Sequence, residues 1–331
     1  MAPIRWTRLC RADESARRRK RRQVDRTPKA GRSRRWSGNR KLICACSEIE
    51  YCERGRFSDG PAGTAAAGFD VMKTCLTVAL GIAALTGFAA DEIDPRLLEA
   101  FAARTFRDPS GAELLYRLAK PPDYDPAKRH PLVMILHGAA GSGSDNARQF
   151  NGGNRVPAAT LTAPTNQAQF PCFVFAPQCP RGEGWTAVAG EQRGANRLAL
   201  AALWALRREF SIDSDRIYLV GLSMGGSGAW DFAARYPNLF AAVVPICGVG
   251  DPARASALTR LPIWCFHGEK DPLVPVNRAR EMIAALKKAG GNPRYSEYPG
   301  VGHDSYVKAF ADPQLLIWLF AQRRGQPPPR E

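Results

Sequence analysis

Gly221-Leu222-Ser223-Met224-Gly225-Gly226 follows a run with β-branched and aromatic side chains, Arg216 to Val220, that is typical of a strand. Residues 227–236 are rich in Ala and aromatic side chains and predict a helix. The G-x-S-x-G spacing at such a strand-to-helix turn lets the backbone take a strained conformation without clashes. The turn would present the Ser223 hydroxyl beside the N–H groups that begin the helix. A glycine-rich turn in which Ser223 only caps the helix has the same pattern, so the rest of the chain must decide between the two.

The remaining sequence alternates apolar runs with segments of helical spacing. Strands are predicted at residues 114–118, 131–136, 173–177, 241–247, 261–266 and 294–298. Helices are predicted at residues 95–103, 195–210 and 276–289, and from the Asp312-Pro313 cap to residue 323. This alternation predicts an α/β fold, with a mostly parallel central sheet and helices on both faces.

A serine becomes a nucleophile when a base takes its proton and a third group holds that base in the right tautomer. The chain has four histidines. His303, in a loop after the last predicted strand, is the candidate base, whereas His137 and His267 end buried strands and are more typical of structural histidines. Asp271, just past a strand, is the candidate acid, although a turn alone also favours aspartate. A rival acid, Asp251, has the pattern of a helix N-terminus.

Ser223, Asp271 and His303 occur in the order of the α/β-hydrolase triad. Each follows a predicted strand, and α/β sheets carry their sites at the carboxyl ends of strands. A tetrahedral intermediate also needs hydrogen-bond donors for its oxyanion. We assign these donors to the backbone N–H groups of Met224 and Ala139. A phosphate-binding loop is the alternative for the glycine-rich turn around Ala139. The turn lacks the G-K-[ST] end of a P-loop and the G-x-G-x-x-G pattern that opens a helix.

Five pieces of sequence carry a resemblance to known enzymes: Leu136 to Ala139, Ala176 to Pro180, Gly221 to Gly226, His267 to Asp271, and Gly302-His303. They lie within residues 112–323. This part of the chain resembles the secreted serine esterases of the α/β-hydrolase superfamily, in the phospholipase/carboxylesterase and feruloyl or acetyl-xylan esterase group. It is also similar to prolyl-oligopeptidase catalytic domains. The resemblance implies the α/β-hydrolase fold, a triad of Ser223, Asp271 and His303, and no cofactor or metal.

The sequence predicts an open site without a lid domain. About a dozen residues separate the strand that ends near Gly248 from the strand that begins near Leu261, which is too short for a lid domain, and no propeller precedes the catalytic part. An open site suits a soluble ester or an ester on a polymer such as a polysaccharide. A peptidase of the prolyl-oligopeptidase type and a phospholipase or thioesterase are the alternatives. Gln178 is a candidate substrate contact, and Trp185 is either a wall for an acyl or sugar group or a buried anchor.

The positive charge is concentrated in the first fifth of the chain. The 331 residues have a net charge of +16, and residues 1–71 hold 18 Lys and Arg against 8 Asp and Glu. Such a composition cannot bury a core, so we expect this segment to be disordered or to be an over-extension of the reading frame. A tail that binds nucleic acid is the alternative from another functional class. No nucleic-acid partner is expected for the catalytic domain.

Residues 72–90 resemble a secretory signal. Lys73 precedes an apolar run, residues 76–85, and small residues suited to cleavage follow it. The pattern predicts translation from Met72 and export of a catalytic domain, residues 91–331, to the periplasm or the medium. A signal anchor is the alternative, but the apolar run is short for a stable membrane span.

Export permits disulfides, and residues 91–331 contain four of the nine cysteines. Cys172 and Cys179 flank one predicted strand and should point apart. Cys247 and Cys265 belong to neighbouring predicted strands and are the better candidate pair.

Overall fold

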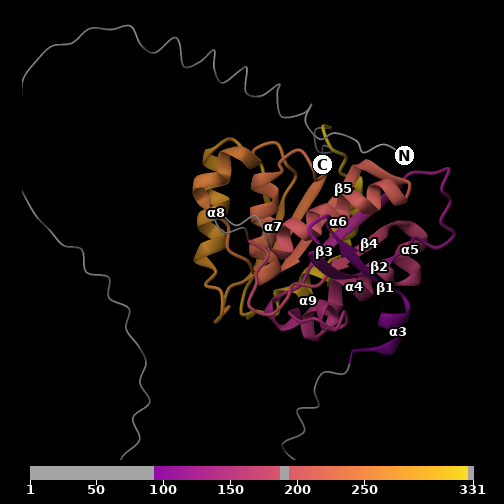
Figure 1. The fold of residues 1–331 in the computed structure, drawn as a ribbon. Coiled ribbons are helices and arrows are strands. Elements are labelled where there is room, and N and C mark those ends of the chain that lie inside the picture. Colours follow the sequence, from indigo (N-terminus) through magenta and orange to yellow (C-terminus); the bar gives the residue numbers. More distant parts are fainter. Residues whose placement is uncertain (1–92, 187–193, 327–331) are drawn as a thin grey trace, which may run out of the picture. The chain divides into compact units, whose positions relative to one another are not determined.

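The structure, a computed structural model, describes residues 93–186 and 194–326. The predicted basic extension (residues 1–71) and signal segment (residues 72–90) lie outside the described residues. Within them, eight strands form one sheet in the order β1-β2-β4-β3-β5-β6-β7-β8. Strands β1 to β5 are labelled in Figure 1. None of the helices described is long and apolar enough to cross a membrane.

The sheet is parallel except at one edge. Its strands are β1 (Ala102–Arg107), β2 (Glu113–Ala119), β3 (His130–Leu136), β4 (Phe173–Pro177), β5 (Ile212–Leu222), β6 (Ala242–Ile246), β7 (Trp264–Gly268) and β8 (Arg294–Tyr298). Strand β2 pairs antiparallel with β1 and β4, and all other neighbours are parallel. The predicted α/β-hydrolase sheet is confirmed. Strand β1 was not predicted, because this edge strand is mostly exposed and has no apolar run.

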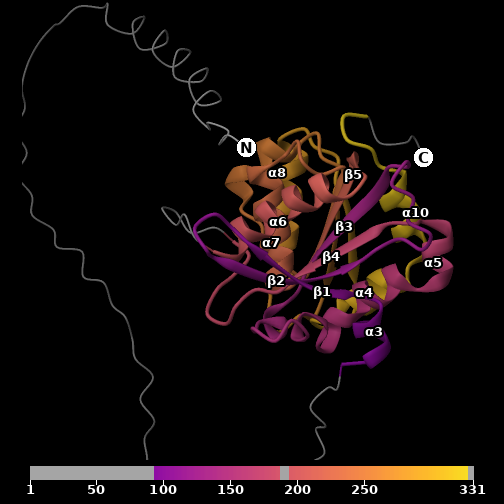
Figure 2. The same cartoon turned by 45° about the vertical axis from the view of Figure 1, so that its right-hand side comes forward.

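Helices cover both faces of the sheet (Figure 2). One face carries α6 (Ala195–Glu209), α7 (Met224–Arg235), α8 (Asn277–Lys288) and η5 (Pro252–Leu258). The other carries α3 (Pro95–Glu99), α4 (Arg155–Thr162), α9 (Ser305–Ala311) and α10 (Pro313–Ala321). Strand β3 shows why both faces are apolar: Leu132, Met134 and Leu136 pack on the first face, and Val133 and Ile135 on the second.

The β3–β4 connection contains short helices that had no signal in the sequence. They are η2 (Ala139–Gly141), η3 (Arg148–Phe150), η4 (Gly152–Asn154), α4 and α5 (Pro164–Gln169). Each is too short to show a helical period, and this part of the chain is rich in Gly and Asn. The predicted helix at residues 95–103 ends earlier, at Glu99, because the chain enters β1.

The predicted disulfide between Cys247 and Cys265 is wrong. All four described cysteines are free and buried. Cys265 packs on the face that carries α6, α7 and α8, and Cys247 packs on the opposite face, so the sheet separates their side chains. Cys172 and Cys179 also pack on opposite faces, as predicted. A disulfide needs side chains that point toward each other as well as neighbouring strands.

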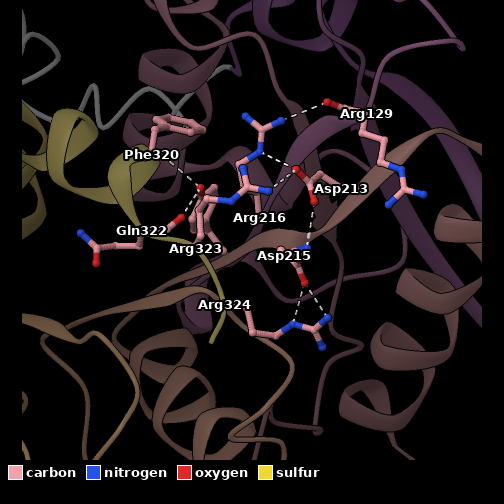
Figure 3. A network of polar contacts seen from close by, with 9 residues as sticks. Arg129, Asp213, Asp215, Arg216, Phe320, Gln322, Arg323 and Arg324 are labelled. Carbon is pink, nitrogen blue, oxygen red and sulfur yellow. Dashed lines mark hydrogen bonds and ion pairs between the residues drawn. The ribbon is translucent and has the colours of Figure 1, made fainter. Parts of the chain in front are cut away.

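A polar network holds the segment after α10 against the first residues of β5 (Figure 3). Arg216 donates to Asp213 at 2.7 Å, Arg323 reaches the same carboxylate at 3.4 Å, and Arg324 donates to Asp215 at 2.7 Å. Burial raises the pKa of Asp213, but the hydrogen bonds, above all that from Arg216, outweigh it and hold this pKa below its usual range. The network anchors β5 at the end opposite the serine turn.

Candidate active site

Ser223 lies in a strained turn between β5 and α7. Its φ of 54° and ψ of −114° are rare for a residue with a side chain. The neighbouring glycines make the turn possible. A Cβ on Gly221 would lie 2.0 Å from the carbonyl oxygen of Gly225, and a Cβ on Gly225 would lie 2.0 Å from that of Leu136. The G-x-S-x-G spacing is therefore a packing requirement, since α7 begins in backbone contact with β3 and β5.

The His303 ring lies between the other two predicted triad side chains. Its Nε2 is 2.9 Å from Ser223 Oγ, and its Nδ1 is 2.7 Å from Asp271 Oδ2. A carboxylate can only accept, so Nδ1 carries the hydrogen and Nε2 presents a lone pair to the serine hydroxyl. The loops after β5, β7 and β8 supply one residue each. This arrangement lets His303 take the Ser223 proton when the oxygen attacks.

Asp271 is fully enclosed, with 0% of its side chain exposed. Its Oδ1 accepts hydrogen bonds from the Leu273 and Val274 N–H groups, both at 2.9 Å. These bonds fix the carboxylate so that Oδ2 faces the base. The rival acid, Asp251, is exposed and caps η5 by accepting from the Ala253 N–H at 3.0 Å, as its sequence pattern indicated.

The two predicted oxyanion donors begin helices: Met224 is the first residue of α7 and Ala139 the first of η2. First-turn N–H groups have no acceptor within their helix. The turn before Ala139 lies against the serine, because a Cβ on Gly138 would be 3.4 Å from Ser223 Cβ. The Gly138 N–H donates to Asn154 Oδ1 at 2.7 Å. Asn154 thus holds the Gly138 turn in place. Its glycine-rich stretch of sequence contains no motif that predicts this role.

His137 supports the same turn and is structural, as predicted. Its Nε2 accepts from the Cys179 N–H at 2.9 Å, and its Nδ1 donates to the Gly138 carbonyl at 2.7 Å. Burial lowers the pKa of His137 to about 4, although the bond to the Gly138 carbonyl opposes this shift. The ring is therefore neutral at physiological pH.

Trp185 and Gln178 are enclosed, which agrees with the buried-anchor alternative for Trp185 and does not support either side chain as a substrate contact. They are 0% and 1% exposed, so neither offers surface to a ligand. Trp185 donates to the His137 carbonyl at 3.0 Å and anchors its loop. Gln178 accepts from the Asn146 N–H at 2.6 Å and donates to Asp145 at 2.8 Å. Both side chains tie loops together near the site.

One group of side chains in the described ranges has the residue types and spacing of a metal site. The ligand atoms of Cys247, Asp271 and His303 lie within 4.8 Å of one another. Asp271 and His303 are already hydrogen-bonded to each other, and burial raises the pKa of Cys247 to about 12. Asp271 and His303 thus already have each other as partners, and Cys247 is a buried thiol beside them.

The strand order, the serine turn and the hydrogen-bonded side chains define the class: the chain has the α/β-hydrolase fold. The model of the dienelactone hydrolase family matches residues 184–314. This segment contains Ser223, Asp271 and His303.

Three comparisons place the chain beside esterases. A solved structure described as a thermostable esterase has a TM-score of 0.63 and 38% identity, over 69% of this chain and 64% of that one. A relative with an esterase name, from Nocardia uniformis subsp. tsuyamanensis, is 27% identical over 188 residues, which are 54% of this chain and 50% of the relative. The chain thus spans half the length of that relative. A ferulic acid esterase from Anaeromyces mucronatus shares the fold, with a TM-score of 0.51 and 17% identity over 65% of this chain and 89% of that one.

Proposed function

We propose that the chain is a serine hydrolase that cleaves carboxylic esters through an acyl-enzyme on Ser223. The hydrogen-bonded series from Ser223 Oγ through His303 to Asp271 is the observation that carries this proposal. Ser223 Oγ attacks the ester carbonyl while His303 Nε2 takes its proton. The N–H groups of Met224 and Ala139 stabilise the oxyanion. His303 then protonates the departing alcohol, and a water molecule releases the acid by the same steps in reverse.

For the substrate, we propose a small ester or an acyl or feruloyl ester carried by a polysaccharide. The β6–β7 connection supports this choice, because it contains η5 (Pro252–Leu258) and no lid domain. The esterase names of the relatives and the ferulic acid bound by a structural neighbour also favour it.

A substrate panel tests the reaction class. We expect turnover of p-nitrophenyl acetate, with methyl ferulate and acetylated xylan as the candidates for higher kcat/KM. Lysophosphatidylcholine and a Gly-Pro p-nitroanilide represent the phospholipase and peptidase alternatives. The anilide should be a poor substrate. If the protein cleaves the anilide and none of the esters, the proposed esterase function is wrong and the peptidase alternative is supported.

We further propose that residues 72–90 direct export and are then removed. The charged, apolar and small-residue segments of that stretch support the proposal. N-terminal sequencing of the protein from its native source should find a chain that begins near Asp91. A protein that begins at Met1 would contradict export by cleavage.

A further inference from the structure

A second histidine lies behind the acid of the triad. His267 is in β7, four residues before Asp271, and its side chain is 0% exposed. Its Nε2 is 2.8 Å from the Val274 carbonyl oxygen and 3.3 Å from Asp271 Oδ2. Both neighbours only accept, so Nε2 carries the hydrogen. The positive end of this N–H therefore points into the turn that presents the carboxylate to His303.

The other ring nitrogen of His267 takes no part in this contact. Nδ1 is buried and has no hydrogen-bond partner among the described residues. The polar contacts of the ring are therefore made through Nε2, whose N–H dipole lies beside the Asp271 carboxylate and stabilises it.

The other titratable groups around His267 are bound to other side chains, protonated or exposed. Glu297, opposite His267 in the β7–β8 register, binds Arg280 at 2.8 Å and the Tyr295 hydroxyl at 2.7 Å. Cys247, at the end of β6, is a protonated thiol because burial raises its pKa to about 12. Asp304, before α9, is exposed.

Asp271 has few sources of stabilisation. In the described part of the chain, the only basic side chains within 4.0 Å of this carboxylate are the rings of His267 and His303. The remaining stabilisation comes from the two backbone N–H groups that bind Oδ1. His267 differs from these groups because it belongs to a buried strand rather than to the acid's own loop.

We propose that His267 is a positioning residue for the triad. Its Nε2–H binds the Val274 carbonyl, which ties the turn of the acid to β7, and places a positive dipole 3.3 Å from Asp271 Oδ2. The ring thereby holds the orientation of the acid and stabilises its charge. The inference rests on the proposed function, since it assigns His267 a part in the same reaction.

The test compares His267→Met with His267→Gln in the full-length protein. Methionine removes the N–H, whereas the glutamine amide can place an N–H near the position of Nε2. The readout is kcat/KM for p-nitrophenyl acetate against pH, whose acidic limb reports the base in the free enzyme. Without the N–H, more negative charge faces His303 and stabilises its protonated form. We expect His267→Met to lower kcat/KM about tenfold and to raise the acidic midpoint by about half a pH unit. His267→Gln should restore the wild-type midpoint.

His130 provides a matched control. It is also a buried histidine whose Nε2 contacts a backbone carbonyl, that of Asp125 at 3.2 Å, but it begins β3 at the opposite end of the sheet. His130→Met and His130→Gln should lower the melting temperature and leave the pH midpoint unchanged. If His267→Met fails to fold, His267→Asn replaces it, because its shorter amide does not reach the Nε2 position.

The outcomes separate the two proposals. An active wild-type enzyme with an unchanged midpoint in His267→Met, or with equal shifts in the Met and Gln variants, overturns the role of His267 alone. A folded wild-type protein that hydrolyses none of the ester panel overturns the proposed function itself.

Discussion

Ser223→Ala is expected to lower kcat for p-nitrophenyl acetate by about 10⁴-fold or more, because it removes the atom that forms the acyl-enzyme. The fold should survive. Alanine lacks only the hydroxyl, and that hydroxyl bonds to His303, which is partly exposed and can bind water. Steady-state kinetics and the melting temperature of the full-length variant measure both effects.

Ser227→Ala is the matched control for this prediction. Ser227 lies one turn further along α7, and its hydroxyl accepts from the Val249 N–H at 2.9 Å. Val249 is exposed, so water can replace that hydrogen bond, and we expect a stability loss of only about 1 kcal/mol with near wild-type kcat. If Ser223→Ala keeps more than a tenth of wild-type kcat, Ser223 is not the nucleophile.

Asp271→Asn is expected to lower kcat by about 10⁴-fold, because the amide holds the base in the wrong tautomer. The cause of this loss is the way the turn after β7 binds the side chain of residue 271. The Leu273 and Val274 N–H groups require an acceptor at the Oδ1 position. The asparagine amide NH₂ must then occupy the Oδ2 position and donate to His303 Nδ1. This forces the hydrogen onto Nε2, so the ring can no longer accept the serine proton.

The pH profile of Asp271→Asn should shift in the direction opposite to that of His267→Met. The neutral amide no longer stabilises a protonated His303, so the residual activity should persist to lower pH than in the wild type. Asp251→Asn is the control, because asparagine also caps helices and Asp251 is exposed. Equal losses in Asp251→Asn and Asp271→Asn, or a residual activity that fails at higher pH than the wild type, would contradict the assignment of Asp271 as the acid.

The sequence predicted the parts of the site that local backbone geometry determines. The serine turn needs glycines at fixed positions around Ser223, because a Cβ there would meet the backbone of α7 or of a neighbouring strand. Asp271 and His303 follow apolar runs, and parallel strands bring their carboxyl ends to one edge. Three separate sequence motifs therefore predicted residues that lie far apart in the chain, and the structure places them within hydrogen-bond distance of one another.

The features that the sequence analysis missed depend on which way a side chain faces. Trp185 and Gln178 lie next to site loops in the sequence, but both point into the protein. Cys247 and Cys265 are on neighbouring strands, but opposite faces of the sheet bury them. The contact between Asn154 and Gly138 joins two loops that are separated by a segment without periodicity. Only the three-dimensional packing determines these orientations.

Covalent labelling with a fluorophosphonate, followed by peptide mass spectrometry, tests the central claim most directly. Such reagents phosphonylate a serine whose proton is taken by a neighbouring base. We predict one adduct, on Ser223, in the active full-length protein, and none in His303→Gln, because the base is then absent. An adduct on another residue, or full activity after labelling of Ser223, would contradict the account.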